Sequence, residues 1–150
     1  MPDMTLREFA AFLSGLAHGM PEAERRGLDK GAQIIEYEAR REIGSYQTSA
    51  GPFSAWPLLA RSTMADRVSK GFPADEPLLR TGVLRNSIGR RVGTREAVIG
   101  SDLPIAVWQE FGTRKIPARS FIGGAAVRKA DEAVQAIAQE VFGPLMRGRR

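Results

Sequence analysis

Residue types that could carry out catalysis are sparse in this sequence. His18 is the only histidine, and cysteine is absent, so disulfides, thiolate metal sites and a cysteine nucleophile are excluded. A metal site needs several ligands, and a catalytic triad needs a base that a third group orients. Neither pattern accompanies His18, which lies between two predicted helical segments. A single histidine in such a place is far more often solvated than catalytic.

The carboxylates and glycines give no catalytic pattern either. Asp75 and Glu76 are adjacent, as are Asp131 and Glu132, and adjacent residues do not face each other on a helix. Carboxylates distant in sequence could still meet in the fold, and that alternative stays open. The glycines between residues 89 and 100 lack the spacing and the strand-to-helix context of a phosphate loop. We therefore expect no catalytic, cofactor-binding or metal site, and a protein that is not an enzyme.

The length of 150 residues fits one domain, which we place over 1–150. No apolar stretch is long enough to span a membrane, and the charged N-terminal segment does not read as a signal peptide. The net charge of +5 is unevenly distributed, because residues 1–45 carry six basic and eight acidic side chains and residues 46–150 carry sixteen and nine.

The segment 80–119 has an excess of positive charge, with eight basic and three acidic side chains. Such a segment is either a solvated face or a contact surface for DNA or for an acidic protein, and charge alone does not choose between them. The candidate interface or DNA-channel residues are Arg90, Arg91, Arg114, Lys115 and Arg119.

Helical spacing of apolar residues predicts two helices in the N-terminal third. Thr5 is a candidate N-cap, and Glu8 completes a capping box for a helix that we expect to end at residues 17–21. Pro21 suits the first turn of a second helix, which we expect to reach about Ile43 before Gly44 stops it.

The rest of the chain alternates loops with short elements. The expected elements are loops at 44–56 and 71–77, a short helix between Pro57 and Gly71, one or two helical turns at 78–88, a β-hairpin at 91–99, a short helix at 105–111 capped by Gly112, an extended run at 113–121, a helix at 124–142 and a flexible basic tail at 144–150.

These elements predict an α+β fold. In this fold a small antiparallel sheet is packed by the long helix of the N-terminal half and by the C-terminal helix, with the long loops projecting. Residues 1–20 form an N-terminal helix or arm of the same domain.

Five motifs have simple local explanations when each is taken alone. Trp56 would anchor a helix start against the core, and Gly82 would allow a tight turn. Gly112 would cap a helix in which Trp108 and Phe111 are buried and mainly structural.

Taken in order, the motifs resemble the tailed-phage neck and tail-completion family. Members of this family are also described as minor tail components or virion morphogenesis proteins, and they include lambda protein Z-like and Mu protein G-like proteins. The resemblance covers residues 50–140. It rests on a W-P-L-L helix start at 56–59, the L-L-R-T-G-V-L-R-N-S-I segment at 78–88, V-I-G-S at 98–101, W-Q-E-F-G-T at 108–113 and P-A-R-S-F at 117–121. The chain departs from the family where Ala106-Val107-Trp108-Gln109 stands in place of tyrosine-alanine and a histidine.

The resemblance implies a structural virion protein of a tailed bacteriophage that completes the tail or the head–tail junction. Its implied partners are copies of itself in a homo-oligomeric ring, a hexamer, together with neighbouring neck, connector or tail-terminator proteins and DNA in the channel. The implied location is the virion, after a stay in the host cytoplasm during assembly, with no membrane contact. The alternative is a basic nucleic-acid-binding module, which would be expected to carry a DNA-binding motif or base-stacking aromatics that this sequence lacks.

Overall fold

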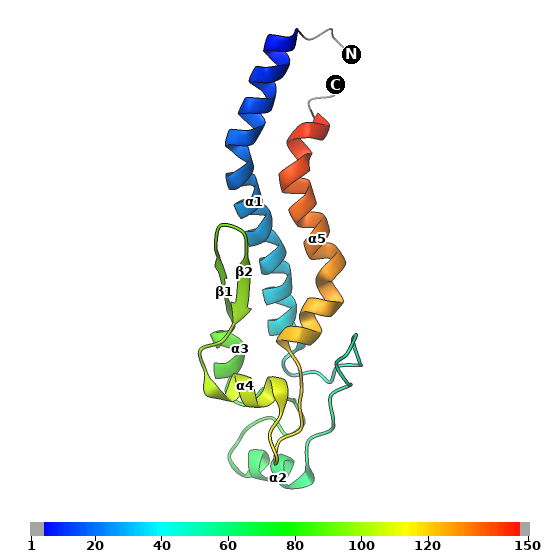
Figure 1. The fold of residues 1–150 in the computed structure, drawn as a ribbon. Coiled ribbons are helices and arrows are strands. Elements are labelled where there is room, and N and C mark those ends of the chain that lie inside the picture. The colour runs from blue at the N-terminus through cyan, green and yellow to red at the C-terminus, as the bar shows by residue number, and fades with distance from the viewer. Residues whose placement is uncertain (1–4, 148–150) are drawn as a thin grey trace.

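The computed structural model describes residues 5–147 and contains two long helices and a smaller head (Figure 1). The elements in chain order are α1 (Leu6–Glu42), α2 (Arg61–Ser69), α3 (Val83–Ser87), β1 (Gly89–Val92), β2 (Ala97–Gly100), α4 (Pro104–Phe111) and α5 (Ile122–Arg147).

Helix α1 is continuous, so the prediction of two separate N-terminal helices was wrong. The capping box at its start is present as predicted, with the Thr5 hydroxyl accepting from the Glu8 N–H at 3.2 Å. Pro21 lies inside the helix, where it removes one backbone hydrogen bond. The helix continues through Pro21 although most of residues 5–19 are exposed, and the close approach to α5 lies on the C-terminal side of Pro21, where Ala23 is buried and Gly27 meets Ile137.

Helix α5 runs to Arg147, beyond the predicted end at Gly143-Pro144. Residues 144–147, assigned to a flexible tail, are therefore helical, and the remaining tail residues 148–150 lie outside the described residues. Helices α1 and α5 lie antiparallel along most of their lengths, and we call this pair the stalk (Figure 1). They approach closely at Gly27 and Gly31, where an added Cβ would lie 3.1 Å from atoms of Ile137.

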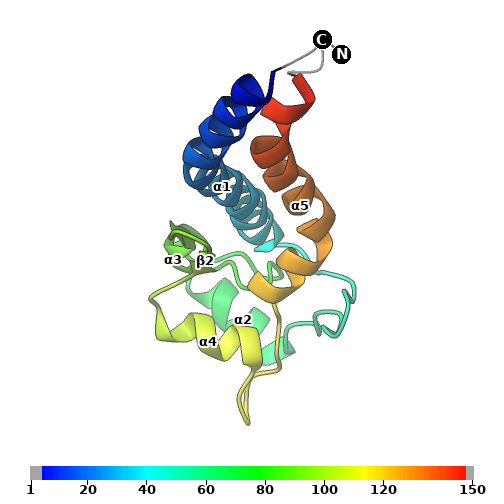
Figure 2. The ribbon, with the colours of Figure 1, turned by 45° about the horizontal axis from the view of Figure 1, so that its top comes forward.

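The predicted hairpin is confirmed and lies against α1. Strands β1 and β2 are antiparallel, with Gly89 opposite Gly100 and Val92 opposite Ala97. Helices α2, α3 and α4 form the head, at the end of the molecule opposite the N-terminal end of α1 (Figures 1 and 2). Helix α2 begins four residues later than the predicted start at Pro57, because residues 54–60 have no regular secondary structure.

Side-chain and backbone hydrogen bonds anchor the two long loops to each other and to the head. The Tyr46 hydroxyl donates to the Asp75 carboxylate and accepts from the Leu59 N–H at 3.1 Å. The Gly44 N–H donates to the Pro77 carbonyl at 2.8 Å. The loops thus lie where the sequence predicted them and help to hold the head to the stalk.

The core lies where the lower ends of α1 and α5 meet the head. It consists of Ala39, Ile43, Trp56, Leu84, Ile88, Ala106, Phe121 and Ala125. The fold is α+β, with a small two-stranded antiparallel sheet and two long helices, as predicted. Among the described residues, no helix has the length and apolar character needed to cross a membrane.

Candidate interaction surface

Three of the five sequence motifs meet in one hydrogen-bonded cluster. The indole N–H of Trp56 donates to the Ser120 carbonyl at 3.2 Å. The Arg119 guanidinium donates from Nε and Nη2 to the Pro57 carbonyl at 3.0 and 2.8 Å, and from Nη2 to the Leu58 carbonyl at 3.1 Å. The motifs at 56–59 and 117–121 are therefore joined although about sixty residues separate them.

Glu110 connects the remaining aromatic motif to the same place. Its carboxylate accepts from the backbone N–H groups of Phe121, Ile122 and Gly123 at 2.9–3.0 Å and from the Ser120 hydroxyl at 2.6 Å. These N–H groups are at the start of α5, where no intrahelical acceptor is available, and an anion also interacts favourably with the helix dipole. We call Trp56, Pro57, Glu110, Arg119 and Ser120 the motif joint.

Sequence reasoning did not find the role of Glu110, since its partners lie ten to thirteen residues away and follow no local spacing rule. Ser120 did leave a signal, because a serine before a helical apolar pattern is a common N-cap. Its hydroxyl accepts from the Gly124 N–H at 3.1 Å.

The two central motifs are joined in a similar way. The Ser87 and Ser101 hydroxyls lie 2.6 Å apart, and the Ser101 hydroxyl also accepts from the Leu103 N–H at 3.1 Å. Gly82 has φ +86° and Gly112 has φ +75°, so the prediction that both need backbone conformations disfavoured by side chains is confirmed.

Helix α4 corrects the prediction that Trp108 and Phe111 are buried. Their exposed fractions are 49% and 75%, and that of Val107 is 56%. The side of α4 that faces inward carries Ala106 and the capping Glu110. Apolar residues lie on most sides of this short helix, so their spacing alone could not show which side faces the core. We call Val107, Trp108 and Phe111 the α4 stripe.

The five basic candidates separate into two groups. Arg90 pairs with Asp29 at 2.8 Å and Glu36 at 2.5 Å, and these hydrogen bonds raise its pKa. Arg119 is buried in the motif joint. Both arginines therefore make contacts within the chain, and their assignment to an interface or DNA channel stays a prediction. Arg91, Arg114 and Lys115 are exposed.

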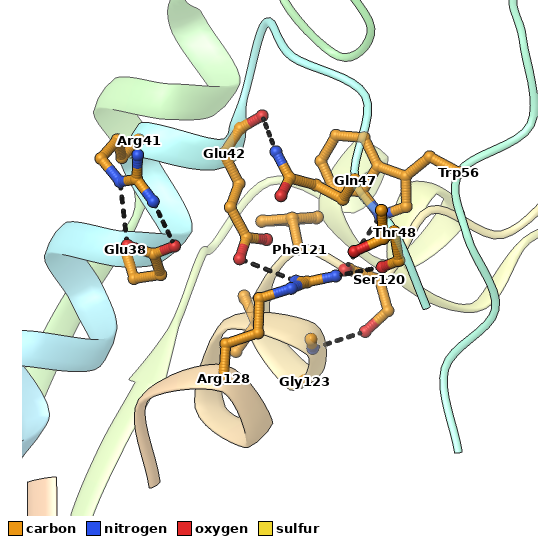
Figure 3. A network of polar contacts seen from close by, with 12 residues as sticks. Glu38, Arg41, Glu42, Gln47, Thr48, Trp56, Ser120, Phe121, Gly123 and Arg128 are labelled. Carbon is orange, nitrogen blue, oxygen red and sulfur yellow. Dashed lines mark hydrogen bonds and ion pairs between the residues drawn. The ribbon is translucent and has the colours of Figure 1, made fainter. Parts of the chain in front are cut away.

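A buried ion pair lies beside the motif joint (Figure 3). Arg128 of α5 donates to Glu42 of α1 at 2.7 Å and to the Thr48 carbonyl. Burial raises the pKa of Glu42 to about 7, although Arg128 acts in the opposite direction. The second carboxylate oxygen, Oε2, is buried and has no hydrogen-bond partner within the described residues. This pair connects both stalk helices and the 44–56 loop.

Over residues 5–147, no group of three or more His, Asp or Glu side chains is arranged to hold a metal ion. The arrangement of the motifs instead provides a rigid support for an exposed apolar surface. Comparison with known protein families, with characterised proteins and with solved structures gives no match.

Proposed function

We propose that this chain is a structural virion protein of a tailed bacteriophage that completes the tail or the head–tail junction by ring assembly at the neck. The resemblance of the ordered motifs supports this function. All five motif segments also supply core or hydrogen-bonding residues at the head, as expected if they were selected as one unit.

The observation that carries the proposal is the α4 stripe. Val107, Trp108 and Phe111 expose large apolar side chains on a helix whose other side is held by Glu110 and Ala106. Exposed contiguous apolar surface is typical of protein–protein contacts, and aromatic residues contribute most of the energy in many interfaces. A rigid support also lowers the entropy cost of docking.

A second apolar surface lies at the other end of the molecule. Leu6, Phe9 and Leu13 on the N-terminal part of α1 are exposed, and this end of the stalk is far from α4 (Figure 1). Ring closure needs a heterologous interface, in which one patch meets a different patch on the next copy. Two separated apolar surfaces on an elongated subunit satisfy this requirement.

The nucleic-acid alternative is less favoured than this role. Of the five basic candidates, Arg90 is paired with two carboxylates of the same chain and Arg119 is buried. Arg91, Arg114 and Lys115 stay available for neighbouring proteins or for DNA in a channel.

Deletion of the gene from the phage that encodes the chain tests the proposal. We expect full heads and separate tails, joined again when the wild-type chain is supplied, and detection of the chain at the neck by immunogold labelling. Complementation with the double variant Trp108→Ala and Phe111→Ala should fail although the protein folds. The matched control is Val134→Ala, at an exposed apolar residue of α5, which should complement. Normal virions from the deletion, or full complementation by the double variant, would contradict the proposal.

A further inference from the structure

A groove separates α2 from α4 in the head. Its volume is about 560 Å³, within the range of pockets that hold ligands or short segments. Leu58, Val83 and Ile105 contribute apolar side chains to its walls, and all three are exposed to solvent. The groove therefore offers apolar contact area that no other part of the described chain covers.

Two buried arginines line this groove. Arg67 is 7% exposed and Arg119 is 5% exposed. Arg67 donates from Nη1 to the Glu76 carbonyl at 2.6 Å and to the Leu79 carbonyl at 3.0 Å, while Arg119 donates to the Pro57 and Leu58 carbonyls. Within residues 5–147, no carboxylate pairs with either guanidinium, although buried charges in proteins are normally paired.

The other charges around the groove do not compensate these two. The charged lining residues are one acid, Asp66, and four bases, Arg67, Arg80, Lys115 and Arg119. Asp66 is already paired with Lys70 at 2.6 Å and lies 3.7 Å from Arg80. Burial lowers the pKa of Arg119, and the positive charge of Arg67 lowers it further, so the two guanidinium groups repel each other. The groove is a positive site enclosed by apolar walls.

Gln109 adds a separate observation on the same groove. Its side chain is among the lining residues, and its Oε1 atom is buried without a hydrogen-bond donor in the described part of the chain. A buried carbonyl oxygen without a donor costs about 1–3 kcal/mol. Rotation of this side chain toward the groove would let a backbone N–H of a bound segment donate to Oε1.

We infer that the groove is a docking site for a segment of a partner protein that presents an Asp or Glu carboxylate to Arg67 and Arg119 and apolar side chains to Leu58, Val83 and Ile105. Guanidinium–carboxylate hydrogen bonds are strong, and pairing would neutralise two buried charges that now contact only carbonyl oxygens within the described residues. A nucleic-acid backbone supplies anions but no apolar side chains for the walls, which favours a protein segment. The inference concerns a surface separate from the α4 stripe and does not rest on the proposed place of the chain in a virion.

Selection of peptides from a random display library on the immobilised full-length chain tests this inference. We expect enriched peptides to share an Asp or Glu flanked by apolar residues. An enriched peptide should bind in titration calorimetry at least tenfold more tightly than its Asn or Gln analogue. In NMR spectra it should shift the side-chain resonances of Arg67, Arg119 and Gln109.

Two variants at exposed valines locate the binding. Val83→Asp introduces a competing carboxylate at the groove wall and should weaken binding at least tenfold, whereas Val134→Asp on α5 should leave it unchanged. Both variants should keep the wild-type circular dichroism spectrum. The inference is overturned by a selection without enrichment, by enriched peptides without acids, or by unchanged binding to Val83→Asp. Displacement of the peptide by inorganic phosphate or duplex DNA at similar affinity would also overturn it, because the groove would then be a phosphate site.

Discussion

The motif joint and the α4 stripe both draw residues from helix α4 but differ in burial and in hydrogen bonding. Glu110 and Phe111 are neighbours, yet the Glu110 carboxylate has four hydrogen-bond donors while the Phe111 ring is largely in solvent. Phe121, ten residues later, is fully buried. These motifs therefore serve two roles: their polar and glycine residues position α4, and the aromatic residues of α4 are available for contact.

The largest effect should come from the buried member of the phenylalanine pair. Phe121→Ala removes a fully buried ring from the core and should lower the free energy of unfolding by about 3–5 kcal/mol, since transfer and cavity terms add. Urea unfolding followed by circular dichroism measures this change. A loss below about 1 kcal/mol would show that the core does not depend on this ring.

The next largest effect should come from Glu110, the carboxylate that caps the start of α5. Glu110→Ala leaves the Ser120 hydroxyl and three N–H groups at the start of α5 without their acceptor, and it should cost about 3–4 kcal/mol. The control is Glu132→Ala, which removes an exposed carboxylate of α5 that forms an ion pair with Lys129. Equal stability of the two variants would contradict the capping role.

The ion pair beside the motif joint predicts a pH dependence of stability. The pKa of Glu42 rises from 4.5 to about 7 on folding, so the folded chain binds this proton more tightly than the unfolded chain. Its contribution is fully present below pH 4.5 and is lost as the pH rises through about 7, at most about 3 kcal/mol. Relative to wild type, Glu42→Gln should therefore gain stability as the pH rises from 4.5 to 8.

Glu38 provides a control of opposite sign. Its hydrogen bonds with Arg41 lower its pKa, so its contribution is present above pH 4.5 and is lost as the pH falls through its lowered folded-state pKa. Unfolding curves at several pH values for Glu38→Gln and Glu42→Gln should differ from wild type in opposite directions. A Glu42→Gln profile parallel to wild type would exclude a raised pKa at Glu42.

The two glycines with positive φ should differ in their tolerance of a side chain. Gly112 has φ +75° and ψ 169°, and an added Cβ would lie 2.8 Å from the Ala118 nitrogen, so Gly112→Ala should cost about 2–3 kcal/mol. Gly82→Ala meets nothing closer than 3.8 Å and should cost only about 1 kcal/mol of backbone strain. Thermal unfolding of the two variants measures the difference, and a larger loss for Gly82→Ala would reverse the argument.

The smallest effect on folding should come from the α4 stripe. Phe111→Ala should change the free energy of unfolding by less than about 1 kcal/mol, because the ring is 75% exposed. Self-association measured by sedimentation should weaken at the same time if the stripe contacts another copy. A loss of stability like that of Phe121→Ala would mean that Phe111 belongs to the core after all.

Several features could be predicted from the sequence because they depend on neighbours along the chain. The Thr5 capping box, the hairpin and the caps at Gly44 and Gly112 involve residues within a few positions of one another. The α+β class follows from the same local signals. Local hydrogen-bond geometry and backbone sterics act without knowledge of the rest of the fold.

Only the tertiary structure decided the features that depend on distant partners. Pro21 lies inside α1 although it carries the local signal of a helix start, and the helix pair approaches closely at Gly27 and Gly31, which a pattern of apolar residues overlooks. Trp108 and Phe111 carry the same apolar signal as buried residues. Burial is decided by what covers a side chain, and here Glu110, bound to the start of α5, turns the aromatic face of α4 outward.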